Sequence, residues 1–257
     1  MQFHAPGTIS GMGVRIFLHS IGLVFNQMGG ALRISGVLYL IYVLVFLIAL
    51  PLADVDAKIT WQSIVALFLT ILIYIWIAVA WHRFILIDER PGGPVPLLNG
   101  ERMLAYLGRT LQTAIIVGAA AILGIGGSVF IFAFVTMIPT IGPIISLIGM
   151  LVVLALILLI GYRLAPLLPG AAIGRPVRIG EAWAATRGAT GPILVVAIAS
   201  ALGAMVIDFP AQLLLHVQGG PMLSSAWLFV TNWVKLMVGV SILTTIYGVY
   251  VEKRVLA

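Results

Sequence analysis

The sequence predicts an all-α, polytopic integral membrane protein with about six transmembrane helices. Apolar residues make up 62% of the 257 residues and charged residues only 9%, against roughly 45–50% and 25% in ordinary soluble domains. Uncharged stretches long enough to cross a bilayer recur along the chain, and most lysines and arginines lie between them. A soluble fold of this size could not hide so much apolar surface, so lipid is the predicted solvent.

Each transmembrane helix is predicted from an uncharged stretch. A helix that crosses a hydrocarbon core of roughly 30 Å needs about 20 apolar residues. The uncharged stretch 110–162 is too long for one helix, and the prolines and glycine of segment 137–143 predict a turn inside it. Strands are excluded because they require an alternating pattern that is absent here. The predicted helices are 34–53, 59–82, 110–136, 144–162, 188–207 and 226–250.

The remaining segments are interpreted from their position beside these helices. Residues 8–32 are expected to form a cytoplasmic amphipathic segment, and Asp208-Phe-Pro210 is expected to end the fifth helix. Residues 211–225 then form a half-polar external loop. The chain, 1–257, is interpreted as a single membrane domain.

The positive charges predict the orientation. All of the 14 lysines and arginines except Lys58 and Lys235 lie on one predicted side of the membrane. The opposite side holds Asp54, Asp56, Lys58, Asp208 and His216. Because positively charged short loops stay in the cytoplasm, we expect a multi-pass protein of a bacterial inner (plasma) membrane with both termini cytoplasmic.

An internal repeat is predicted from the spacing of similar residues. The second, fourth and sixth helices each close with an aromatic residue and an arginine, and Arg83 and Arg163 are 80 residues apart, as are Glu101 and Glu181. We interpret this as three copies of an inner amphipathic segment followed by a helical hairpin. The alternative is that helices leaving toward the cytoplasm commonly end in such residues. That alternative does not explain the equal spacing.

Two segments carry a resemblance to a known family. They are Arg163-Leu-Ala-Pro-Leu-Leu-Pro-Gly170 and Gly174-Arg-Pro-Val-Arg-Ile-Gly-Glu-Ala-Trp-Ala-Ala-Thr-Arg187. The chain resembles uncharacterised six-helix proteobacterial membrane proteins that are similar to the membrane domain of glycerophosphoryl diester phosphodiesterases. The resemblance implies a six-helix membrane fold. It is specific to residues 161–187, and no phosphodiesterase site is carried over.

The sequence predicts no catalytic, cofactor or metal site. Cysteine is absent, and the four histidines have no second ligand at metal spacing. The positive charge marks one membrane face, so nucleic acid is not an expected partner. An enzyme at the cytoplasmic interface is the alternative, and it would require Asp88, Glu89, Glu101 and the loop arginines to converge on one pocket.

Four arginines form the densest basic region and are candidate lipid-headgroup contacts. Planar guanidinium groups can bind anionic lipid phosphates at the cytoplasmic face. The alternative is that these arginines only hold their loop inside. They are Arg163, Arg175, Arg178 and Arg187.

Lys235 is the one charge inside a predicted span, and with Asn232 and Asp208 it forms a candidate intramembrane polar site. Asn232 lies one turn earlier on the same face of the helix. We favour a lysine whose stem snorkels outward beside Trp227 and Trp233. The alternative is an ion pair with Asp208.

Small residues recur every four positions on two predicted helices, at Ala120, Gly124 and Ser128 and at Ala199 and Gly203. Such stripes allow helices to pack closely. They fit either the chain's own bundle or another membrane protein.

These observations predict a non-enzymatic inner-membrane protein: a scaffold, an assembly factor or an accessory subunit of a membrane complex. The expected partners are membrane lipids, together with another membrane protein or a second copy of the chain. The alternative is a transporter or binder of lipid or another amphiphile, which the repeat, the basic inner face and Lys235 favour.

Overall fold

The computed structural model describes residues 9–49 and 60–256, which form helices and no strand. Six of the described helices are long and apolar enough to cross a membrane, so the predicted all-α polytopic membrane fold is confirmed. His4, Asp54, Asp56 and Lys58 lie outside the described residues. The helices are α1 (Ile9–Asn26), α2 (Met28–Ala49), α3 (Trp61–Ile87), α4 (Gly100–Val135), α5 (Gly142–Leu164), α6 (Leu167–Ala172), α7 (Ile179–Ala185), the short 3-10 helix η2 (Arg187–Ala189), α8 (Thr190–Leu214) and α9 (Gly220–Tyr250).

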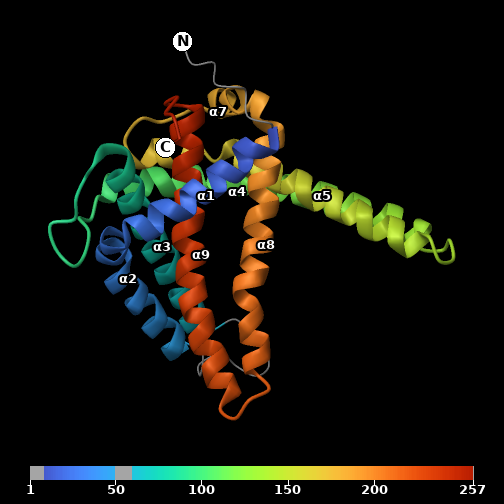
Figure 1. Ribbon diagram of the computed structural model, residues 1–257, viewed down its shortest axis with the longest axis horizontal. Coiled ribbons are helices and arrows are strands. Elements are labelled where there is room, and N and C mark those ends of the chain that lie inside the picture. Colours follow the sequence, from blue (N-terminus) through green and yellow to red (C-terminus); the bar gives the residue numbers. More distant parts are fainter. Residues whose placement is uncertain (1–8, 50–59, 257) are drawn as a thin grey trace.

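The six long helices form three hairpins, α2–α3, α4–α5 and α8–α9, and the two helices of each hairpin pack against each other. The hairpins spread in different directions from a shared end (Figure 1). We call this shared end the hub: α1, α6, α7 and the adjoining ends of the three hairpins. The threefold repeat requires that the hairpins superpose, and it stays a prediction.

The first transmembrane helix begins earlier than the predicted residue 34. α1 ends at Asn26 and α2 begins at Met28, so the described part of segment 8–32, from Ile9 on, is divided between two helices. Gly30 permits this arrangement, because a Cβ there would lie 2.7 Å from Phe84 Cζ, and α2 thus packs on α3 from its first turn. Arg33 belongs to α2 and remains exposed.

The third span begins in the predicted cytoplasmic loop. α4 starts at Gly100 rather than at 110, because the Asn99 side chain accepts a hydrogen bond from the backbone N–H of Arg102 at 3.2 Å and so caps the helix. Neighbouring bounds shift less: α3 extends to Ile87, and α4 and α5 turn at residues 136–141.

The prediction of an external loop at residues 211–225 is wrong. α8 continues through Pro210 to Leu214, and α9 begins at Gly220, so the connection is only 215–219. A proline removes one backbone donor from a helix. The Trp227 indole donates to the Ile207 carbonyl at 2.8 Å, one turn before the proline, and this tertiary contact supports the helix there.

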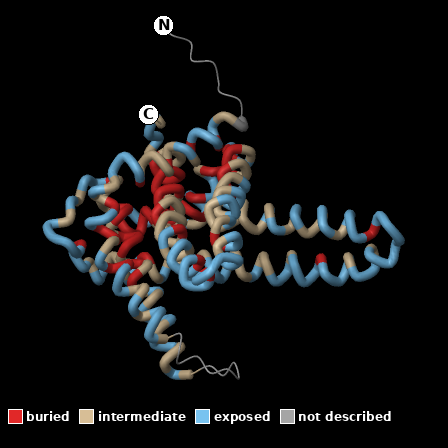
Figure 2. Tube along the Cα trace, turned by 60° about the horizontal axis from the view of Figure 1, so that its bottom comes forward, coloured by how far each residue is buried: buried red, intermediate tan, exposed pale blue. Residues whose placement is uncertain are grey.

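α9 lies at the centre of the hub, where it packs against α1, α3, α6 and α8. The buried residues concentrate in this region, whereas the hairpins are largely exposed toward their tips (Figure 2). Met237, Ile242 and Ile246 of α9 are at most 1% exposed. Along the hairpins the exposed apolar side chains are available to lipid. Close packing of one side chain of the protein against another is therefore found mainly in the hub.

Both small-residue stripes pack within the chain. A Cβ at Gly124 would lie 3.1 Å from Val153 Cγ1 of α5, and one at Gly203 would lie 3.3 Å from Phe17 Cζ of α1. The small residues therefore allow helices of the chain's own bundle to pack closely. Packing within the bundle is one of the two alternatives that the sequence left open.

Candidate intramembrane polar site

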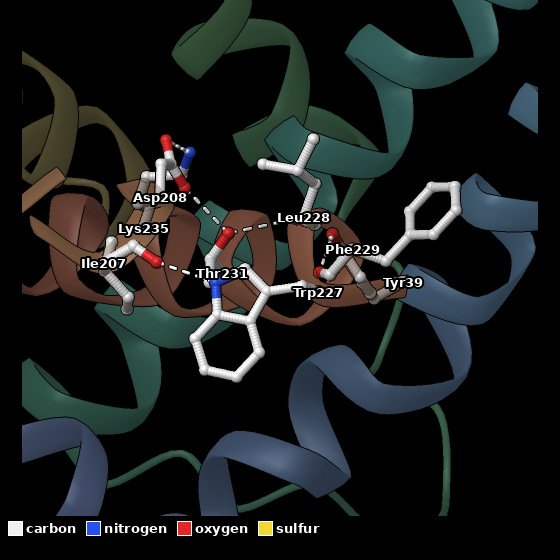
Figure 3. A network of polar contacts seen from close by, with 8 residues as sticks. All are labelled: Tyr39, Ile207, Asp208, Trp227, Leu228, Phe229, Thr231 and Lys235. Carbon is white, nitrogen blue, oxygen red and sulfur yellow. Dashed lines mark hydrogen bonds and ion pairs between the residues drawn. The ribbon is translucent and has the colours of Figure 1, made fainter. Parts of the chain in front are cut away.

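An ion pair joins the two helices of hairpin α8–α9. Lys235 Nζ donates to Asp208 Oδ2 at 2.5 Å, and Thr231 Oγ1 donates to Asp208 Oδ1 at 2.8 Å (Figure 3). Thr231 and Lys235 are one turn apart on α9, so both side chains reach the same carboxylate. The interpretation of a lysine that only snorkels is therefore wrong, and the pairing alternative is observed.

The two charged residues lie on neighbouring helices that pack against each other. With the helix extended to Leu214, Asp208 lies inside α8 rather than in a loop, and it faces α9. Lys235 is the central residue of α9, Gly220–Tyr250, about 22 Å from either end at 1.5 Å per residue. Ionisable residues at such positions are costly in hydrocarbon and are candidates for function.

Asn232 is not part of this contact. It is half-buried on α9 beside Thr231. Within the part of the chain that the structure describes, its side chain is hydrogen-bonded to neither Asp208 nor Lys235. The observed polar site is therefore Asp208, Thr231 and Lys235, and Thr231 is a member that the sequence did not predict.

A groove of about 410 Å³ adjoins the ion pair between α1, α8 and α9. Its lining is mainly apolar, and Lys235 contributes a charged group to it. Volumes of this size are typical of small-molecule sites, which combine apolar walls with few polar groups. This combination makes the groove and the pair a candidate binding site.

The four candidate headgroup arginines do not act alike. The Arg163 guanidinium lies 4.7 Å from the ring centroid of Trp183 and donates to Thr190 Oγ1, so it links α5 to α7 and α8. Arg175 pairs with Glu252 at 3.3 Å. Arg163 and Arg175 thus have side-chain partners within the chain, although Arg175 is itself exposed, as are Arg178 and Arg187.

The loop carboxylates do not converge on one pocket. Glu89 pairs with Arg83, which also donates to the Ala172 carbonyl at 3.1 Å. The Asp88 and Glu101 side chains are 76% and 79% exposed, and each pairs with a neighbouring arginine. The hydrogen bond from Arg83 lowers the pKa of Glu89, so this pair stabilises the fold at neutral pH and is lost as the pH falls through that lowered pKa.

Sequence reasoning missed a buried polar network in the hub. His82 is fully buried, with Nδ1 2.8 Å from Thr244 Oγ1 and Nε2 3.5 Å from the Tyr106 hydroxyl. Next to it, the Trp81 indole donates to Ser241 Oγ at 2.9 Å. The available signal was the run of hydroxyl residues Ser241, Thr244 and Thr245 inside an apolar helix.

No protein-family model, curated protein or solved structure matches the chain. The resemblance to the membrane domain of glycerophosphoryl diester phosphodiesterases therefore stays a prediction.

Proposed function

We propose that the chain is a non-enzymatic protein of a bacterial inner membrane that acts as a scaffold, assembly factor or accessory subunit. Another membrane protein docks its transmembrane helices on the hairpin α4–α5. One observation carries this proposal: the two helices of that hairpin make few contacts with the rest of the chain along most of their length.

The hairpin α4–α5 extends away from the hub as a separate arm (Figures 1 and 2). In the most apolar part of each of its spans only 6% of the residues are buried, against 22–28% in the other four spans. Helices in lipid associate by close packing and not by hydrophobic burial. The arm therefore offers two long apolar faces to a second protein without disturbing the hub.

Two glycines on the arm contact no other side chain among the described residues. Gly126 and Gly127 of α4 are exposed, and nothing lies within 4 Å of a Cβ built at either position. A glycine inside a helix costs about 1 kcal/mol relative to alanine. Small residues on an open transmembrane face let a partner helix approach closely, which offsets that cost in a complex.

Crosslinking from the arm tests this proposal. The chain has no cysteine, so Leu123→Cys on α4 and Val206→Cys on α8, at positions 76% and 73% exposed, carry a photoreactive label at single sites. In native membranes we expect one major protein adduct at position 123 and none at 206. Adding Gly126→Leu should lower that yield at least about tenfold, equivalent to about 1.4 kcal/mol, while Gly239→Leu leaves it unchanged.

The substitution at position 126 should not act by unfolding the helix, because leucine has a higher helix propensity than glycine. Equal products at positions 123 and 206, or a yield that Gly126→Leu does not change, would contradict docking on the arm.

The orientation part of the proposal rests on the positions of the arginines. Among residues 9–49 and 60–256 the arginines lie in α1, near the hub ends of the hairpins or in the segments that join them, while the tips at 136–141 and 215–219 contain no lysine or arginine. This distribution supports a cytoplasmic hub with external tips. The exposed arginines at the hub, Arg178 and Arg187, would then contact anionic lipids.

Single cysteines at Thr140, Gly219, Gly93 and Arg175 test the orientation. A membrane-impermeant thiol reagent added to intact cells should label positions 140 and 219. It should label positions 93 and 175 only after the membrane is permeabilised. The reverse pattern would refute the proposed orientation.

A further inference from the structure

We propose that the groove between α1, α8 and α9 binds one acyl chain of a neutral amphiphile whose head carries hydrogen-bond-accepting oxygens, such as a monoacylglycerol. The acyl chain lies along the apolar walls of the groove, and Lys235 donates a hydrogen bond to an oxygen of the ligand's head. This site is independent of the arm α4–α5.

The walls of the groove suit an acyl chain. Phe17, Ile21 and Phe25 line it from α1, and Val238 and Ile242 line it from α9. The lining residues of α9 run from Val234 to Ile242, about 12 Å at 1.5 Å per residue. A groove of about 410 Å³ with these dimensions holds one chain rather than two.

The groove is kept open by glycine. Gly239 lines it, and nothing lies within 4 Å of a Cβ built there. The glycine is therefore not required by packing within the chain, although it costs about 1 kcal/mol of helix stability relative to alanine. Gly203, on the opposite wall, allows Phe17 to approach α8. An occupied groove accounts for the open position at 239.

Lys235 has hydrogen bonds left to donate. An ammonium group has three N–H donors, and Asp208 accepts from it at 2.5 Å. No other acceptor for Nζ is found among residues 9–49 and 60–256, and the side chain is 30% exposed. By contrast, the hydroxyl of Ser200, near the other end of the groove, already donates to the Val196 carbonyl. Lys235 is the charged donor of this lining, and we therefore place the head of a ligand there.

The charge of the site selects a neutral head. Asp208 already neutralises Lys235, and Thr231 occupies its other carboxylate oxygen. An anionic head would add an uncompensated negative charge beside that carboxylate, which is costly away from water. An ester or hydroxyl oxygen accepts from the ammonium without adding charge. A monoacylglycerol is therefore expected to bind better than a fatty acid with the same acyl chain.

The probe for this site is a monoacylglycerol with a diazirine in its acyl chain, used on the full chain in lipid nanodiscs. Light should attach the probe to peptides of α1, α8 and α9, and unlabelled monoacylglycerol should compete with it. A fatty acid of the same chain length should compete at least about tenfold more weakly, equivalent to about 1.4 kcal/mol. Labelling of the wild-type protein that does not saturate, or stronger competition by the fatty acid, would overturn the proposal.

Two matched variants complete the test. Gly239→Leu fills the groove and should reduce saturable labelling at least about tenfold, whereas Gly36→Leu, at an equally open position of α2, should leave it unchanged. The double variant Asp208→Leu/Lys235→Leu removes the ammonium donor to the head without leaving an unpaired charge, and it should weaken competition by unlabelled monoacylglycerol at least about tenfold. Unchanged labelling in Gly239→Leu, or unchanged competition by monoacylglycerol in the double variant, would overturn the proposal.

Discussion

Replacing Trp81 with alanine should lower the free energy of unfolding by about 3–5 kcal/mol. The Trp81 side chain is 0% exposed, and its indole donates to Ser241 of α9 at 2.9 Å. The substitution would leave a cavity in the hub and a buried hydroxyl without its donor. Thermal unfolding of the purified protein in mild detergent measures the effect.

Trp61 provides the matched control on the same helix. It lies at the start of α3 and is 69% exposed, so Trp61→Ala should change stability by less than about 1 kcal/mol. Equal losses for the two variants would contradict the hub as the centre of stability. They would indicate instead that tryptophans stabilise this chain wherever they lie along α3.

Replacing Lys235 with leucine should lower the stability by about 1–3 kcal/mol. Removing one partner of a buried ion pair costs about 3–5 kcal/mol, and we reduce that value because the Lys235 and Asp208 side chains are 30% and 34% exposed. The double variant Asp208→Leu/Lys235→Leu should recover most of the loss, because no charge is left without its partner. A double-mutant cycle of thermal stabilities measures this coupling.

The cycle tests whether the observed ion pair stabilises the fold. If it contributed nothing, replacing Lys235 with leucine would leave stability intact or raise it, since an expensive charge is removed. The effects of the two single substitutions would then add. Additive effects would refute a stabilising role of the ion pair.

The membrane class and the number of spans could be predicted because each span depends on its own composition. A stretch such as 110–162 must enter lipid whatever its neighbours do. Bounds were less predictable, because they depend on contacts between distant residues. Pro210 predicted a helix end. The indole of Trp227 instead supports the helix at this point, and α8 continues to Leu214.

The candidate site could be predicted only in part for the same reason. Lys235 and Asp208 were both recognised, and their pairing was one of two interpretations. Snorkelling was favoured because Trp227 and Trp233 flank Lys235 in the sequence. The contact of Lys235 with Asp208 at 2.5 Å depends on how α8 packs against α9, which the sequence of either helix alone does not fix. His82 gave no local signal, because its partners Thr244 and Tyr106 are distant in the chain.

The central position of α9 has a consequence for biosynthesis. A chain enters the membrane from its N-terminal side, so α9 is the last of the described helices to be inserted. Until then Trp81 and Ser20 lack their hydroxyl partners Ser241 and Thr245, and α1 lacks its packing against α9. Ribosome-bound chains that stop before α9 should therefore expose unpaired polar groups, which membrane quality-control proteases can recognise.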